Sequence, residues 1–91
     1  MNEHKVDVNA TDLSGFTALH FATIRDNYNL MAKLLSFGAH VNAQDKVGNT
    51  PLFYAFRYRV SAAAINLLLD HGAAPMIENK YGVRPIDLPG N

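Results

Sequence analysis

Histidine, serine and aspartate are the residues of this chain that could do chemistry, because their side chains bind metals, move protons or attack carbonyl carbons. The histidines stand too far apart for the helical or hairpin spacing of a metal pair, and no cysteine accompanies them. They are His4, His20, His40 and His71. We therefore expect no metal site and no cofactor.

Nucleophilic catalysis and phosphate binding are not indicated either. No serine lies in a G-x-S-x-G motif, and a tight turn explains the Ser14-Gly15 pair. The glycines recur at regular distances instead of clustering into a phosphate-binding loop. The sequence predicts that the chain is not an enzyme.

The regular spacing belongs to an internal repeat. A shift of 33 residues superimposes Asp12 on Asp45, Gly15 on Gly48, Thr17 on Thr50, Leu19 on Leu52 and Ala22 on Ala55. Gly38 and Gly72 are 34 residues apart, so one residue is inserted after Ala55 and before Gly72. Such a period indicates one supersecondary unit that is copied and stacked, each copy burying its apolar face against the next.

Each copy predicts a tight turn followed by two helices. Asp12 and Gly15 bracket the first turn, Thr17 caps a short helix, and Gly38 ends the next helix. The second copy repeats the scheme, with Pro51 after its cap and Ser61 as the second cap. Helical spacing predicts that the second helices bury Leu30, Met31, Leu34 and Leu35 in one copy and Ile65, Leu68 and Leu69 in the other.

The two copies, DLSGFTALHFATIRDNYNLMAKLLSFGAHVNAQ and DKVGNTPLFYAFRYRVSAAAINLLLDHGAAPMIE, resemble the ankyrin repeat. The resemblance rests on D-x-x-G, the T-[AP]-L step, the Leu-Leu pairs and the closing Gly-Ala with Val-Asn-Ala. It implies an all-α, ankyrin-type solenoid of stacked helix-turn-helix repeats with hairpin-like turns. We expect one domain over 1–91: a partial repeat tail (1–11), a repeat (12–44), a repeat with one inserted residue (45–78) and a truncated repeat (79–91).

Two polar residues have roles that the resemblance implies. His20 stands where the ankyrin family has a histidine that makes a structural hydrogen bond to the threonine of the cap and to the neighbouring loop. Asn42 stands where the family has an asparagine that ties the hairpin together, and in some members that asparagine is hydroxylated. For both residues we favour the structural role.

Recognition of a partner is then the expected function. In proteins that this chain resembles, residues beside the turn glycine and at the exposed end of the first helix form a concave binding face. The matching turn residues are Leu13, Ser14, Phe16, Lys46, Val47, Asn49, Lys80, Tyr81 and Val83, and the helix residues are Ile24, Arg25, Arg57 and Tyr58. Aromatic and arginine residues are enriched in binding hot spots, although Phe16 has the alternative of folding back onto a neighbouring turn.

Composition limits the kind of partner. Eight basic residues cancel eight acidic ones, which argues against nucleic acid because phosphate binding needs a concentrated positive field. No apolar stretch is long enough to cross a membrane. The absence of cysteine fits an intracellular protein, in the cytoplasm or nucleus.

We therefore interpret the chain as a non-catalytic protein-protein interaction module. The alternative is a structural or oligomerising fragment of a larger ankyrin-containing regulatory protein. Stacked repeats generally need about three copies to bury a continuous core, and only two are complete here. Self-association through the uncapped end repeats belongs to this alternative.

Overall fold

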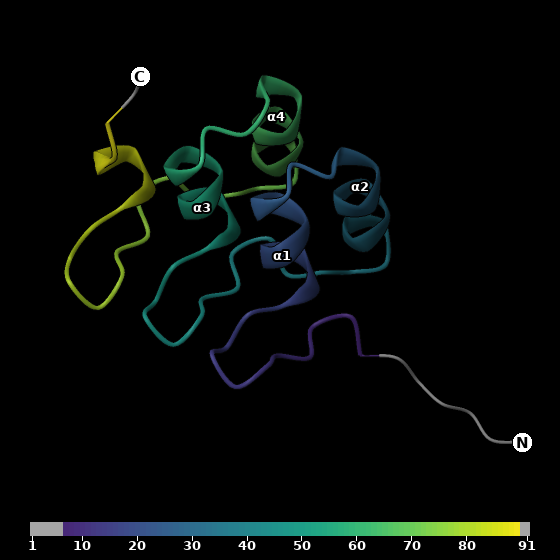
Figure 1. The fold of residues 1–91 in the computed structure, drawn as a ribbon, viewed down its shortest axis with the longest axis horizontal. Helices are drawn as coiled ribbons and strands as arrows, with labels where there is room; N and C mark the ends of the chain where they lie inside the picture. Colours follow the sequence, from purple (N-terminus) through teal and green to yellow (C-terminus); the bar gives the residue numbers. More distant parts are fainter. Residues whose placement is uncertain (1–6, 90–91) are drawn as a thin grey trace, which may run out of the picture.

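The computed structural model describes residues 7–89. Helices α1 (Ala18–Ile24), α2 (Tyr28–Ser36), α3 (Pro51–Arg57) and α4 (Ala62–Asp70) are followed by the short 3-10 helix η1 (Pro85–Asp87). Figure 1 shows α1, α3 and η1 in one row, with α2 and α4 in a second row behind it. Three turns project from the first row in the same direction. The predicted all-α ankyrin-type solenoid is confirmed.

Side-chain caps set where the helices begin. The Thr17 hydroxyl accepts the backbone N–H of the third residue of α1, and the Thr50 hydroxyl does the same for α3. Pro51 is the first residue of α3, where its missing N–H costs nothing. Asn27 and Ser61 cap α2 and α4 through their side-chain oxygens. Each cap satisfies one of the orphan N–H groups at a helix start.

The core lies between the two rows of helices. Leu19, Met31, Leu52 and Leu68 are fully buried there. In α2 the buried stripe is centred on Met31 and Leu35, and in α4 it is centred on Ala64 and Leu68. These are pairs four residues apart on one helix face.

Two residues predicted to be buried lie at the edge of these stripes. Leu30 and Leu69 are each 40% exposed, so the prediction that they face the core was wrong. Helical spacing identifies the apolar face of a helix, but the neighbouring helix covers only the middle of that face. Leu34 and Ile65 pack against the core while partly buried.

The loops between paired helices differ by the inserted residue. Asp26 and Arg59, which are 33 positions apart, both adopt a φ of 54°. The caps that follow them, Asn27 and Ser61, are 34 positions apart, so the extra residue is Val60. Val60 is buried and joins the core cluster. The insertion therefore lengthens the second interhelix loop and turns its extra side chain inward.

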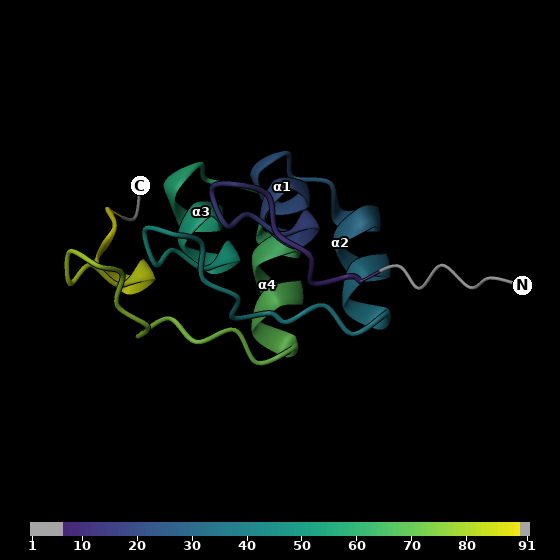
Figure 2. The same cartoon turned by 90° about the horizontal axis from the view of Figure 1, so that it is seen from below.

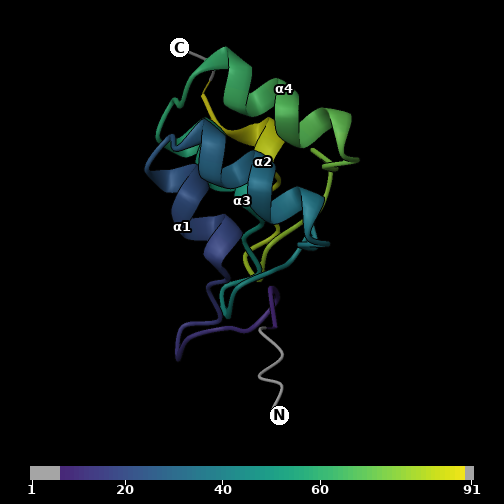
Figure 3. The same ribbon diagram turned by 90° about the vertical axis from the view of Figure 1, so that its right-hand side faces the viewer.

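Neighbouring helix pairs also contact each other through a polar link. The Asp26 carboxylate accepts the backbone N–H and the hydroxyl of Ser61, at 3.0 Å and 2.9 Å. This contact joins the interhelix loop of the first pair to the start of α4. Figure 3 shows the helices stacked at one end of the molecule and the turns gathered at the other.

Candidate functional site

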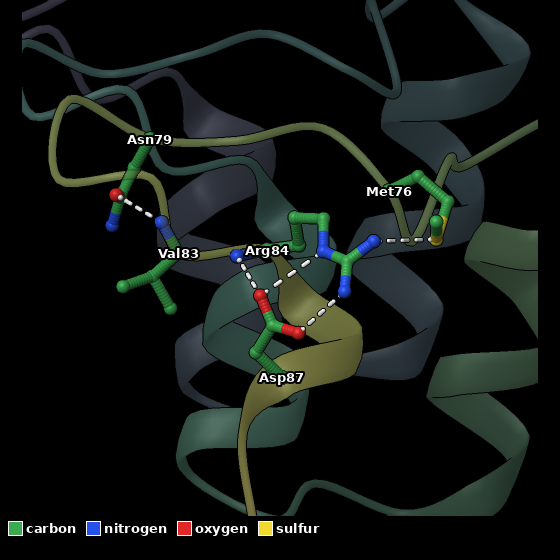
Figure 4. A network of polar contacts seen from close by, with 5 residues as sticks. All are labelled: Met76, Asn79, Val83, Arg84 and Asp87. Carbon is green, nitrogen blue, oxygen red and sulfur yellow. Dashed lines mark hydrogen bonds and ion pairs between the residues drawn. The ribbon is translucent and has the colours of Figure 1, made fainter.

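Three successive turns are built by the same hydrogen bonds. In the first, the Asp12 Oδ1 atom accepts the N–H groups of Ser14 and Phe16, at 2.9 Å each. Asp45 serves the second turn in the same way, and the amide oxygen of Asn79 serves the third (Figure 4). One side chain thus fixes each turn from within.

The turns are also tied to one another. The Lys46 N–H donates to the carbonyl oxygen of Ser14 at 3.0 Å, and the Lys80 N–H donates to that of Val47 at 2.8 Å. A Cβ atom on Gly48 would lie only 2.9 Å from the backbone of the next turn. The glycine therefore permits the close approach that sets the register of the row, and Figure 2 shows the turns lying across the ends of α1 and α3.

The tips of this row carry exposed apolar and basic side chains. Leu13 is 91% exposed, Tyr81 78% and Val47 38%. Lys46 and Lys80 are exposed beside them. Each of the three turns thus presents one exposed apolar side chain, and two of the turns present a lysine next to it.

One predicted turn residue is not accessible. Asn49 is buried, and its amide donates to the Tyr54 hydroxyl and accepts from the Asn79 amide. It lies directly before the helix cap, where the chain turns inward, so its side chain is used to join two turns. Of the other predicted turn residues, Ser14 is exposed and Val83 is half-buried.

Phe16 folds back instead of projecting from its turn. Its ring centroid lies 5.5 Å from that of His20, 5.1 Å from that of Phe21 and 5.6 Å from that of Tyr54. The last two contacts are edge-on, the geometry that aromatic rings favour. Phe16 thus folds back, but onto the rings of α1 and α3 and not onto a neighbouring turn, and it is half-buried there.

His20 is the polar centre of this aromatic cluster. Its Nε2 atom lies 2.9 Å from the carbonyl oxygen of Asn49, and its Nδ1 atom lies 3.0 Å from the backbone nitrogen of Thr17. A carbonyl only accepts, so Nε2 carries the proton and Nδ1 accepts from Thr17. Burial lowers the pKa of His20, and the Asn49 carbonyl partly opposes that shift. The structural role predicted for His20 matches this geometry.

Tyr54 is a structural residue that the sequence interpretation missed. Its hydroxyl donates to the Asp45 carboxylate and accepts from the Asn49 amide. Burial and the bond to Asp45 raise the pKa of Tyr54 to about 12. The repeat pattern did not indicate this network. The position of the histidine in the first copy is occupied by Phe53 in the second, so no polar side chain was expected there.

The ends of α1 and α3 extend the surface beyond the turns. Arg25, Arg57 and Tyr58 are exposed, whereas Ile24 is half-buried. The Arg57 guanidinium lies 5.6 Å from the centre of the Tyr58 ring, within the range of a cation-π contact. Together with Lys46 and Lys80 these arginines make the face basic, although the chain as a whole carries no net charge.

The third turn leads into η1 through an ion pair. The Asp87 carboxylate accepts the backbone N–H of Arg84 at 2.9 Å and its guanidinium at 2.8 Å and 3.1 Å (Figure 4). These bonds hold the pKa of Asp87 down at about 2. The Arg84 side chain also reaches the Met76 sulfur. Asp87, the third residue of η1, thus accepts the N–H of the residue before the helix, as His20 does for Thr17 in α1.

Asn42 has the contacts of a structural residue. Its side chain accepts the Ala74 N–H at 2.9 Å and donates to the Gly72 carbonyl at 3.1 Å. Asn9 makes the same two bonds to His40 and Gly38, one repeat earlier. The amide of Asn42 is therefore engaged between neighbouring loops, as the structural interpretation requires.

A second surface feature lies at the C-terminal end of the stack. A groove of about 410 Å³ is lined by Ala55, Phe56, Arg59, Val60, Ile65, Pro85, Ile86, Leu88 and Pro89. The sequence analysis located the inserted residue after Ala55 and before Gly72, but it did not predict a groove. The walls come from α3, α4 and the segment around η1, so no single stretch of sequence reveals them.

Within residues 7–89 no group of three histidine, aspartate or glutamate side chains is arranged to hold a metal ion. His4 lies outside these residues. In the same part of the chain, no helix has the length and apolar character needed to span a bilayer.

Comparison with known proteins gives consistent matches. A family model described as ankyrin repeats, in three copies, matches residues 1–79. The ankyrin repeat protein OPG189 of monkeypox virus is 32% identical over 78 residues, covering 86% of this chain and 14% of that protein. The human transient receptor potential cation channel subfamily A member 1 is 39% identical over 75 residues, covering 82% of this chain and 7% of the channel. The tyrosine-protein kinase HTK16 of Hydra vulgaris is 35% identical over 74 residues, covering 81% of this chain and 10% of the kinase.

Proposed function

Because the chain belongs to the ankyrin-repeat family, whose repeats are generally protein-protein interaction modules, we propose that it binds a protein partner through its turn tips and the adjoining ends of α1 and α3. The chain spans only 14% of the viral relative and 7% of the channel. What it shares with them is the repeat region, and the kinase and channel chemistry that their names indicate lies outside that likeness. The proposed role is non-catalytic.

The rigid register of the three turns carries this proposal. Each turn is closed by an Asp or Asn side chain and bonded to the next turn through the backbone. The exposed side chains at their tips are therefore held at fixed spacing before any partner arrives. Pre-organisation of this kind reduces the ordering entropy that binding would otherwise cost.

The proposed surface keeps most of the predicted residues. It consists of Leu13, Ser14, Ile24, Arg25, Lys46, Val47, Arg57, Tyr58, Lys80, Tyr81 and Val83. Asn49 is excluded because it is buried, and Phe16 acts beneath the surface as a support.

The charges of this surface favour an acidic partner. Lys46, Lys80, Arg25 and Arg57 are exposed. Of the acidic side chains in the turns, Asp45 is buried and hydrogen-bonded. Asp12 is exposed, and it accepts two backbone N–H groups of its own turn. A matching partner would present Asp or Glu residues around aliphatic or aromatic side chains. Charge complementarity of this kind speeds association and selects among partners.

A matched pair of double variants tests the proposal. The Lys46→Ala, Tyr81→Ala variant removes a basic and an aromatic side chain from the turn tips. The Lys33→Ala, Tyr28→Ala variant removes the same types from the exposed face of α2. A partner captured from the native cell extract should bind the turn variant at least about tenfold more weakly and bind the α2 variant normally. Equal loss in both variants, or loss in the α2 variant alone, would contradict the proposed surface.

A second candidate is a structural or oligomerising piece of a longer repeat array. The lengths of the relatives favour it, because the matched segment is a small part of each. The two candidates differ in self-association. Sedimentation over a wide concentration range should give a constant monomer mass for the binding module, whereas a mass that rises with concentration supports assembly through the end repeats.

A further inference from the structure

The groove at the C-terminal end of the stack lies beside the second interhelix loop, which is one residue longer than the first. The inserted Val60 turns inward against the core and forms part of the groove wall, between α3 and α4. Residues around η1 form the opposite wall, including Ile86, which is 54% exposed. The interior is therefore built from aliphatic and proline side chains together with Phe56.

The charged residues of this groove are all basic. Arg59 lines the apolar part, and a neighbouring hollow of about 430 Å³ that shares Phe56, Arg59, Leu88 and Pro89 is also lined by Arg57. Within residues 7–89 neither arginine has an ion-pair partner; the only such pair joins Arg84 to Asp87. No acidic side chain lines either hollow. An apolar hollow lined by arginines that have no ion-pair partner suits a ligand that carries a carboxylate beside apolar groups.

Comparison of the two interhelix loops indicates that this end of the stack disfavours a further helix stacked on α4. Asp26 accepts the N–H and hydroxyl of Ser61, so its carboxylate meets the start of α4. Arg59 occupies the same place in the second loop, with the same φ of 54°. A helix stacked on α4 as α4 is stacked on α2 would bring its unpaired N–H groups to a guanidinium instead of a carboxylate. The positive end of that helix and the arginine would repel each other.

We propose that this groove, lined by Phe56, Arg59, Val60, Ile65 and Ile86, binds a short acidic and apolar peptide segment of another protein. An aliphatic side chain of that segment enters the space beside Val60, and a carboxylate pairs with Arg59. The site lies at the interhelix end of the molecule, away from the turn tips. Its neighbouring hollow shares Arg57 with the surface proposed above, but none of the residues that line the groove itself belongs to that surface.

Three synthetic peptides test the site on the whole chain. One alternates leucine and glutamate, one replaces every glutamate by lysine, and one replaces every leucine by serine. Nuclear magnetic resonance shifts of backbone amides report where each peptide binds. The leucine-glutamate peptide should shift the amides of Val60, Ile65 and Ile86 saturably and leave those of Leu13 and Tyr81 unchanged. The lysine and serine peptides should each bind at least about tenfold more weakly.

The Arg59→Glu variant tests the charge directly. The variant should weaken binding of the leucine-glutamate peptide at least about tenfold, which is the effect of one lost charge-assisted contact. It should also partly restore binding of the lysine peptide. The Lys33→Glu variant makes the same charge reversal on the exposed face of α2 and should leave both affinities unchanged. Unfolding midpoints measured for both variants separate a loss of binding from a loss of fold.

Four outcomes would overturn the proposal. No saturable shift at Val60 or Ile86 would remove the site. Equal binding of the glutamate and lysine peptides would remove the acidic specificity. Shifts confined to the turn tips would assign the peptide to the other surface. Shifts at Ile65 and Ile86 that grow with protein concentration without peptide would assign the groove to a second copy of the chain.

Discussion

The Nε2 atom of His20 lies 2.9 Å from the backbone carbonyl oxygen of Asn49, so a side chain of the first helix pair secures the turn that opens the second. Through its other ring nitrogen the same side chain accepts the N–H of Thr17 and helps to cap its own helix. One fully buried imidazole thus joins a helix start to the neighbouring repeat. The orientation of the second turn depends on that contact.

Replacing His20 should therefore weaken the whole stack. His20→Ala leaves the Asn49 carbonyl and the Thr17 N–H without their partner and opens a cavity beside Phe16. The free energy of unfolding should fall by about 2 to 4 kcal/mol, measured by urea denaturation. His40→Ala is the control, because His40 is exposed, and its effect should stay within about 0.5 kcal/mol. Similar losses in the two variants would mean that the buried contacts of His20 contribute no more to stability than the exposed side chain of His40 does.

The same histidine should make stability depend on pH. Burial lowers the pKa of His20 below the 6.5 of the unfolded chain, so the unfolded state binds the proton more readily. The contribution of neutral His20 is fully present above about pH 6.5 and is lost as the pH falls from there toward its folded pKa. Urea midpoints of the wild type and of His20→Gln should therefore differ most near neutral pH and converge in acid. A difference that grows as the pH falls would contradict this assignment.

The repeat itself was predictable because its signals are local. The threonine caps, Pro51 and the turn residues act within a few positions, so their spacing indicates turn, helix, loop and helix in order. Three other features depend on the neighbouring residues that cover each side chain: the exposure of Leu30, the burial of Asn49 and the inward fold of Phe16. The sequence of a single copy does not show which residues those are. The groove could not be predicted for the same reason. The sequence indicates the insertion that Val60 represents, but the groove wall beside Val60 is completed by Ile86 from another segment.

Tyr54 should stabilise the fold through its hydroxyl. Tyr54→Phe keeps the ring contacts with Phe16 but leaves Asp45 and Asn49 without that hydroxyl. We expect a loss of about 1 to 2 kcal/mol in the free energy of unfolding. Tyr81→Phe is the control at an exposed turn tip and should change stability by less than about 0.5 kcal/mol.

The phenol of Tyr54 should also titrate late. Its folded pKa is raised to about 12, above the ordinary value of 10, so its contribution is present below pH 10 and is lost as the pH rises toward 12. Phenolate absorbance of the folded chain should show one tyrosine ionising near pH 12, and Tyr54→Phe should abolish that late step. A late step that persists in Tyr54→Phe but disappears in another tyrosine variant would assign it elsewhere.

Gly48 should be far less replaceable than Gly38, although both have a φ of 94°. Alanine at either position suffers the left-handed backbone conformation, which costs about 1 to 2 kcal/mol. Only at Gly48 does the new Cβ also collide with the following turn, 2.9 Å from the Asn79 Cα atom, whereas Gly38 has nothing within 4 Å. Gly48→Ala must then push the second and third turns apart, which breaks the bond from the Lys80 N–H to Val47. Urea denaturation should give Gly48→Ala a cost larger by at least about 1 kcal/mol, and amide hydrogen exchange at Lys80 should accelerate in this variant alone. Equal costs, with Lys80 still protected, would mean that the backbone contact between turns does not hold their register.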